Sequence, residues 1–157
     1  MKKILKTDKP TRYFTKNEKE YCKFVIENKK ITNDLIKIGL YSNKTFTIDM
    51  PKLNSVLIRH FIRGYFDGDG TILHGNRSSV FSITSNIKIV TSIQKILMQE
   101  CNLLKTKFAI RRKKSPNIVT MNYGGNRQVR RIYDYLYKDS NIFLPRKKEK
   151  FEKFIIF

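Results

Sequence analysis

The chain has 157 residues, 40% hydrophobic and 12% aromatic, so it is long enough for one domain with a core and is not expected to be disordered. Its 33 Lys and Arg against 13 Asp and Glu give a formal net charge of +20, and such a charge on a folded chain indicates a polyanionic partner, with nucleic acid first. Because no run of about 18 apolar residues and no secretory leader is found, we expect an intracellular protein, in the cytoplasm, an organelle or a phage-infected cell.

The first third of the chain is basic and weakly patterned. Residues 1–19 are expected to form a loose arm, residues 21–27 have the composition of a strand, and residues 31–39 that of a short amphipathic helix ended by Gly39. Pro51 then marks a boundary. We therefore predict two parts, residues 1–53 and residues 54–157.

The second part alternates between helical and strand patterns. A helix capped by Asn54 or Ser55 is followed by a strand pair, a helix capped at Ser85-Asn86, a second strand pair and a third helix. The strands are expected at residues 71–74, 79–84, 105–113 and 117–123, the third helix at 128–137 and another helix in the basic tail 145–157. The order α-β-β-α-β-β-α predicts an α+β fold with antiparallel hairpins.

The first of these helices ends in an unfavourable way. Asp67 and Asp69 lie at its C-terminus, where the helix dipole is negative and each carboxylate costs about 0.3–1 kcal/mol. A cation should offset that cost, and a divalent metal ion is the natural candidate. Zinc is not expected, because His60, His74, Cys22 and Cys101 lack ligand spacing; the two cysteines are expected to be reduced, partly buried thiols.

Small residues share one face of the same helix. His60, Gly64 and Gly68 recur every four residues, a spacing that lets two helix backbones approach closely. The alternative is that one glycine fits a local side chain and the other ends the helix. If two such helices pack along this face, their acidic ends converge, and shared metal ions there can hydrolyse a phosphodiester.

Residues 62–70, Ile-Arg-Gly-Tyr-Phe-Asp-Gly-Asp-Gly, resemble the LAGLIDADG motif of homing endonucleases and of their intein and maturase relatives. The resemblance implies an αββαββα half-domain and a site-specific, metal-dependent endonuclease for double-stranded DNA. It implies that Asp69 binds the metal with Gly68 beside it, that Asp67 supports the turn and the site, and that Gly64 and Gly68 pack against a second motif helix. Ser82 and Arg127 stand near the positions of the family's polar and basic active-site residues.

The family's strands form a saddle in the DNA major groove, so the resemblance implies that the four strands here do the same. Strand ribbons fit that groove and present alternate side chains to the bases. The DNA contacts expected on this basis are Arg77, Ser79, Ser82, Thr84, Lys107, Arg111, Arg112, Lys113, Lys114, Asn126 and Arg127. The run Lys147–Lys150 is ambiguous and could be a solvated helix face.

The chain contains one motif, whereas the family's site needs two. Three explanations stay open: a homodimer, pairing with a separate front fragment, and a decayed remnant. Residues 28–52 and 122–147 share the order strand end, helix, turn and a Pro followed by basic residues. This echo favours a two-motif ancestor, of whose first half residues 1–53 would be a partial β-α remnant.

Other readings of the same residues are weaker. Residues 67–78 resemble the start of an EF-hand loop but carry Ile72 where the loop needs Gly. Residues 29–45 could pass for part of a helix-turn-helix, a pattern that arises often by chance. The main alternative to an endonuclease is a non-catalytic DNA- or RNA-binding remnant, or a maturase-like RNA-binding module.

Overall fold

Two compact units make up the chain, one formed by Met1–Lys37 and the other by Ile38–Phe157. The computed structural model describes residues 6–40, 49–75, 78–110 and 117–155. Within these ranges, no helix combines the length and the apolar character that a membrane span requires.

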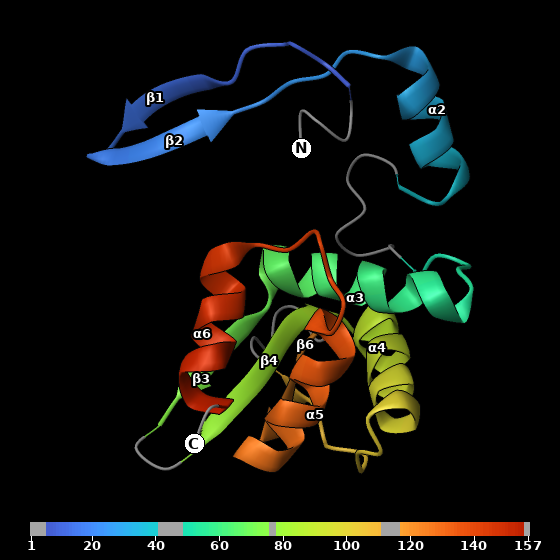
Figure 1. The fold of residues 1–157 in the computed structure, drawn as a ribbon. Helices are drawn as coiled ribbons and strands as arrows, with labels where there is room; N and C mark the ends of the chain where they lie inside the picture. The colour runs from blue at the N-terminus through green and yellow to red at the C-terminus, as the bar shows by residue number, and fades with distance from the viewer. Residues whose placement is uncertain (1–5, 41–48, 76–77, 111–116, 156–157) are drawn as a thin grey trace. The chain divides into compact units, whose positions relative to one another are not determined.

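The first unit is a hairpin followed by a helix. Strands β1 (Arg12–Lys16) and β2 (Lys19–Lys23) pair in antiparallel fashion, and helix α2 spans Lys29–Lys37 (Figure 1). The prediction of a loose arm over residues 1–19 was therefore wrong for residues 12–19, and its first five residues lie outside the described ranges. Asn17 and Glu18 form a two-residue turn with positive φ at both positions (50° and 60°), a geometry that favours Asn or Gly and that a Glu does not signal.

The second unit has the predicted order of elements. Its helices are α3 (Ser55–Asp69), α4 (Ile87–Glu100), α5 (Asn126–Tyr137) and α6 (Pro145–Ile155), and its strands are β3 (Thr71–His74), β4 (Ser79–Asn86), β5 (Ala109–Ile110) and β6 (Ile118–Gly124). The strands form one antiparallel sheet in the order β3-β4-β6-β5. The α+β prediction is confirmed. The strand expected over residues 105–113 is shorter, with only Ala109–Ile110 paired among the described residues.

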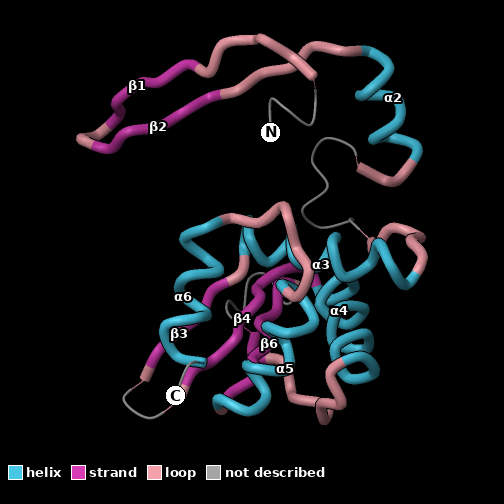
Figure 2. Tube along the Cα trace, in the orientation of Figure 1, coloured by secondary structure: helices cyan, strands magenta, loops and turns pink. Residues whose placement is uncertain are grey.

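One face of this sheet carries the core. Helices α4, α5 and α6 contact the sheet, and α3 lies where β3 begins (Figures 1 and 2). Alternate strand residues point toward these helices and are buried: Ile72, Phe81, Ile83, Val119, Met121 and Tyr123. The residues between them form the open face of the sheet, defined here by Thr71, Leu73, Val80, Ser82, Thr84, Thr120 and Asn122.

Asparagine side chains begin two of the helices. Asn54 Oδ1 accepts a hydrogen bond from the Leu57 N–H at 2.9 Å, and Asn86 Oδ1 accepts one from the Ile89 N–H at 3.1 Å. A side-chain cap satisfies an N–H group that has no partner within the helix. Of the two candidates for the first cap, Asn54 is the residue used. Cys101 follows α4 and is buried as expected, whereas Cys22 is exposed on β2, contrary to the prediction.

Gly70 ends α3 at a position where no side chain fits. Its N–H donates to the Phe66 carbonyl, and a Cβ placed on Gly70 would lie 2.1 Å from Cδ2 of the fully buried Phe66 ring. We expect Gly70→Ala to lower the free energy of unfolding by about 1–3 kcal/mol, because the ring must move within a packed core. Urea denaturation would measure this loss. Gly124→Ala is the control, since its Cβ would meet nothing closer than Val80 Cγ2 at 3.8 Å, and an equal loss there would contradict the explanation.

Candidate active site

The Asp67 carboxylate is buried at the end of α3 and both of its oxygens accept hydrogen bonds. Oδ1 accepts from the Tyr137 hydroxyl at 2.5 Å, and Oδ2 accepts from the Leu144 N–H at 2.8 Å. Burial, followed by the hydrogen bond to Asp67, raises the pKa of Tyr137, so this hydroxyl stays protonated and donates. Asp67 therefore joins the motif helix to the end of α5 and to the segment before α6.

Arg63, one turn earlier, makes a second connection to the same region. Its Nε donates to the Ile142 carbonyl at 2.8 Å and its Nη1 to the Leu136 carbonyl at 2.9 Å, and the side chain is buried. Burial lowers the pKa of Arg63, while the negative charge of Asp67 raises it. Asp67 and Arg63 therefore attach the last two turns of α3 to one region, which consists of the end of α5 and the segment between α5 and α6.

Lys147 places a cation at the C-terminal end of α3. The side chain is buried, its Nζ donates to the Gly70 carbonyl, and the ammonium lies 5.1 Å from the centroid of the Phe66 ring. Burial lowers the pKa of Lys147, and the charges of Asp67 and Asp69 act in the opposite direction. The sequence left the run Lys147–Lys150 ambiguous, and the burial of Lys147 rules out a solvated face at this position. A usable signal was the four-residue spacing from Lys147 to Phe151, which places Lys147 on the buried face of α6.

Asp69, by contrast, is exposed beyond this network. No hydrogen bond or ion pair from the described part of the chain engages its carboxylate. Its neighbour Gly68 is also exposed, so the Gly68 carbonyl is a candidate second oxygen. Among the described residues, no group of three or more His, Cys, Asp or Glu could hold a metal ion. One carboxylate and one carbonyl fit a shared magnesium site that also takes oxygens from a phosphate and a second carboxylate.

A polar row crosses the open face of the sheet next to Asp69. Thr71, two residues after Asp69, pairs with Ser82, which pairs with Asn122. Ser82 therefore lies in the row that begins at Thr71 and is 9% exposed, and its role in the site stays a prediction. Asn122 is exposed in the same row and was missed by the sequence reasoning, although the alternation of β6 with Met121 and Tyr123 on the buried face could have revealed it.

Arg127 does not lie at this end of the unit. It belongs to the first turn of α5, whereas Tyr137 in the last turn of α5 contacts Asp67, ten residues and about 15 Å along the helix axis. The suggestion that Arg127 acts beside Asp69 in the same chain is therefore corrected. The motif alignment could not place Arg127, because the direction of α5 relative to α3 is set by tertiary packing.

The predicted DNA contacts fall into three groups. Thr84 lies on the open face, and Lys107, Asn126 and Arg127 are exposed outside the strands. Ser79 was wrongly predicted, because it is buried at 1% exposure on the face covered by helices and its N–H donates to Asn126 Oδ1. The remaining cations lie outside the described residues: Arg77, Arg111, Arg112, Lys113 and Lys114.

The glycine stripe of α3, defined here as Val56, His60, Gly64 and Gly68, has room for a neighbour. Within the described residues, and apart from the neighbouring residues and backbone of α3 itself, no atom comes within 4 Å of a Cβ built on Gly64 or Gly68, and Val56 is 64% exposed. His60 is half-buried beside a cavity of about 540 Å³, which Gly64 also lines, and burial lowers its pKa, with Arg63 and Arg59 acting in the same direction. A neutral imidazole and small residues form a surface that tolerates close packing of a second helix.

Replacement of Asp67 should be costly for folding. We expect Asp67→Ala to lower the free energy of unfolding by about 3 kcal/mol, because two hydrogen bonds to a charged acceptor are lost and the Tyr137 hydroxyl and Leu144 N–H remain buried. Urea denaturation at neutral pH would measure the change. Asp134→Ala removes an exposed carboxylate that forms a surface ion pair with Arg130, and should cost less than about 1 kcal/mol. Equal losses in the two variants would contradict the buried-network interpretation.

Comparison with protein-family models matches residues 57–137 to the LAGLIDADG-like domain, which is just over half of the chain. A search of curated proteins gave no match. The matched range begins in α3, ends with Tyr137 at the end of α5, and includes the motif helix, all four strands of the sheet and α4. The chain therefore belongs to the LAGLIDADG family, whose members are generally DNA-binding nucleases.

Proposed function

We propose that this protein is a divalent-metal-dependent, sequence-specific endonuclease for double-stranded DNA, of the homing-endonuclease type that moves introns or inteins. The observation that carries the proposal is the contrast between the two motif aspartates. Asp67 has both oxygens engaged in a buried network, whereas Asp69 is exposed beside a glycine stripe with space for a second helix.

This contrast assigns different roles to the two aspartates. Asp67, Arg63 and Lys147 hold the end of α3 rigid, so that Asp69 and the Gly68 carbonyl have a fixed position. Mg²⁺ or Mn²⁺ bound there would activate water and stabilise the charge on the phosphate. The Ser82 hydroxyl and the Asn122 amide can orient water or the DNA backbone, because they share a row that begins at Thr71, two residues after Asp69.

The second half of the site would come from another motif helix. Packing two glycine stripes against each other would bring two Asp69 carboxylates together, and we propose a second copy of this chain as the partner. A separate chain with its own motif helix is the alternative. That residues 1–53 are a partial first half-domain and residues 54–157 a complete one also remains a proposal.

The decisive assay incubates the purified protein with a plasmid library of random targets in the presence of Mg²⁺ or Mn²⁺. The proposal expects cleavage of a subset of plasmids at one shared sequence. Binding that weakens with salt, without nicking or cutting in either metal, would contradict the endonuclease proposal. That result would instead support a non-catalytic DNA- or RNA-binding role.

A further inference from the structure

The first unit lacks a core of its own. Within residues 6–37, no side chain is buried, including those of the β1–β2 ribbon and α2. An isolated two-stranded ribbon is only marginally stable in water. The exposed faces of this unit are therefore candidates for contact with another molecule.

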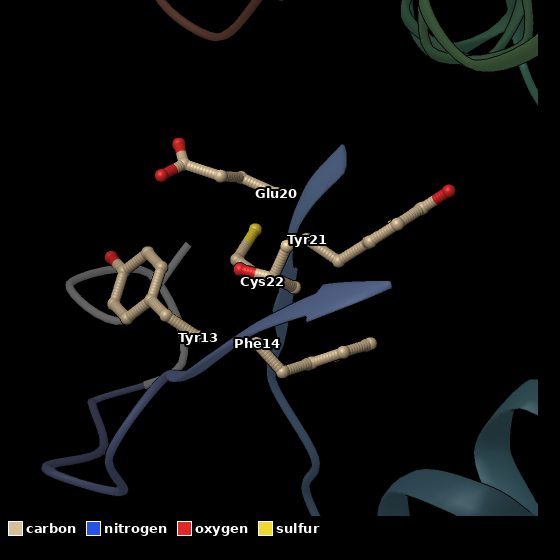
Figure 3. Close-up of a pocket in the computed structure, with 6 residues that line it drawn as sticks. Tyr13, Phe14, Glu20, Tyr21 and Cys22 are labelled. Carbon is tan, nitrogen blue, oxygen red and sulfur yellow. The ribbon is translucent and has the colours of Figure 1, made fainter. Parts of the chain in front are cut away.

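The cross-strand register gives the two faces of the ribbon different chemistry. Side chains that lie opposite each other in an antiparallel pair point to the same side. The basic face, as named here, carries three such pairs: Arg12–Lys23, Phe14–Tyr21 and Lys16–Lys19. The other face carries Tyr13, Thr15, Glu20 and Cys22, and Figure 3 shows Phe14 and Tyr21 on the opposite side of the ribbon from Tyr13 and Cys22.

The charges on the basic face destabilise the isolated ribbon. Two of its three pairs place like charges directly opposite each other, which is unfavourable in a sheet. The acidic residue of the two strands, Glu20, lies on the other face. A bound polyanion would offset this repulsion, because its phosphates would lie beside each pair of cations and attract both of them.

The dimensions of the basic face suit a DNA groove. Its two cationic pairs lie four residues apart along the strands, about 13 Å at 3.3 Å per residue. The width across the ribbon is set by two strands about 4.8 Å apart. The major groove of B-DNA, about 12 Å wide, admits such a two-stranded ribbon, and the spacing of about 13 Å then runs along the ribbon. The Phe14 and Tyr21 rings lie between the cations, stack at 5.5 Å and are 46% and 44% exposed, so they can contact thymine methyl groups on the groove floor.

We propose that the β1–β2 ribbon is a second DNA-binding module, which places its basic face in the major groove of duplex DNA outside the footprint of the nuclease unit. The ribbon lies outside the family match at residues 57–137, so this inference goes beyond the proposed function. The chain after α2 tethers the ribbon to the second unit with a short reach, because Leu40, three residues past Lys37, already packs against the core of that unit. This tether holds the ribbon at high effective concentration near any DNA that the second unit binds.

The test measures binding of the full chain to random-sequence duplex DNA as a function of salt, without divalent metal and therefore independently of cleavage. The variant R12Q/K16Q/K19Q/K23Q removes the four cations of the basic face. The matched control K6Q/K9Q/K29Q/K30Q removes four charges from the same unit outside the ribbon. A charge-conserving variant, R12K/K16R/K19R/K23R, shows whether charge alone is needed. Amide hydrogen exchange checks that β1 and β2 remain paired, which we expect because neutralisation removes like-charge repulsion.

Each phosphate contact contributes about 0.9 to the slope of log K against log salt, so the ribbon variant should lose about 3–4 from this slope. The matched control should lose less than about 1, and the charge-conserving variant should keep the slope of the parent. An unchanged slope in the ribbon variant overturns the proposal. So does an equal loss in the matched control, or a loss seen with single-stranded but not with duplex DNA.

Discussion

Asp69→Asn should abolish DNA cleavage while leaving DNA affinity nearly unchanged. The substitution removes the negative charge that would hold a divalent cation, and a metal ion contributes several kcal/mol to the stability of the transition state. At about 1.4 kcal/mol per factor of ten, cleavage should fall by about a thousandfold or more. Single-turnover cleavage of a cognate duplex would give the rate, and fluorescence anisotropy without metal would give the affinity.

The control for this prediction is Asp134→Asn, which makes the same change of charge on an exposed carboxylate of α5. It should keep the parental rate. Because Asp69 is exposed and outside the Asp67 network, Asp69→Asn should also keep the parental stability. If the variant cuts as fast as the parent, Asp69 is not the metal ligand.

Gly64→Leu should abolish cleavage for a different reason, because it fills the space that the second motif helix would occupy. Apart from the neighbouring residues and backbone of α3 itself, no described atom lies within 4 Å of a Cβ at this position, so the folded chain itself should tolerate the leucine. A clash in a tightly packed interface costs about 1–3 kcal/mol and occurs twice in a symmetric pair. Pairing should weaken by about two orders of magnitude or more, as measured by sedimentation equilibrium alongside the cleavage rate.

The smaller substitution Gly64→Ala should change stability and pairing in opposite directions. Alanine stabilises a helix interior by about 1 kcal/mol relative to glycine, so thermal unfolding of the dilute, unpaired chain should occur at a higher temperature while pairing weakens. Lys95→Leu, at an exposed position of α4, is the control for added apolar surface and should leave pairing unchanged. Pairing that survives Gly64→Leu would exclude this stripe as the interface.

Local sequence signals were sufficient for the motif helix and its surroundings. The Asn54 cap, the apolar positions of α3 and the alternation in β4 and β6 are short-range features, and the order of elements in the second unit followed from them. The contrast between Asp67 and Asp69 was available only through the resemblance to the LAGLIDADG motif. Without that resemblance, the sequence does not show which of two aspartates two residues apart is buried and which is exposed.

The remaining features depend on contacts between distant residues. Lys147 donates to Gly70 across 77 positions, and Arg127 lies far from Asp67 because α5 points its other end toward α3. Neither relationship has a local pattern, although the spacing of Lys147 and Phe151 indicates that Lys147 is buried. A strand that overlaps β2 was predicted at residues 21–27, but β1 and the hairpin were missed because the turn uses a glutamate with positive φ, which has no recognisable sequence pattern.

The contacts that α6 and the segment before it make with the end of α3 determine how long a stable fragment of the second unit must be. The family match stops at Tyr137, yet the groups that immobilise the motif include the Leu144 N–H, the Lys147 ammonium and the Phe151 ring, which packs 5.2 Å from Phe66. A gene fragment trimmed to the matched boundaries would encode every motif residue but would lack the residues that hold the end of α3 in place. The smallest fragment that keeps these contacts with the motif helix therefore extends fourteen residues past the family boundary, to Phe151.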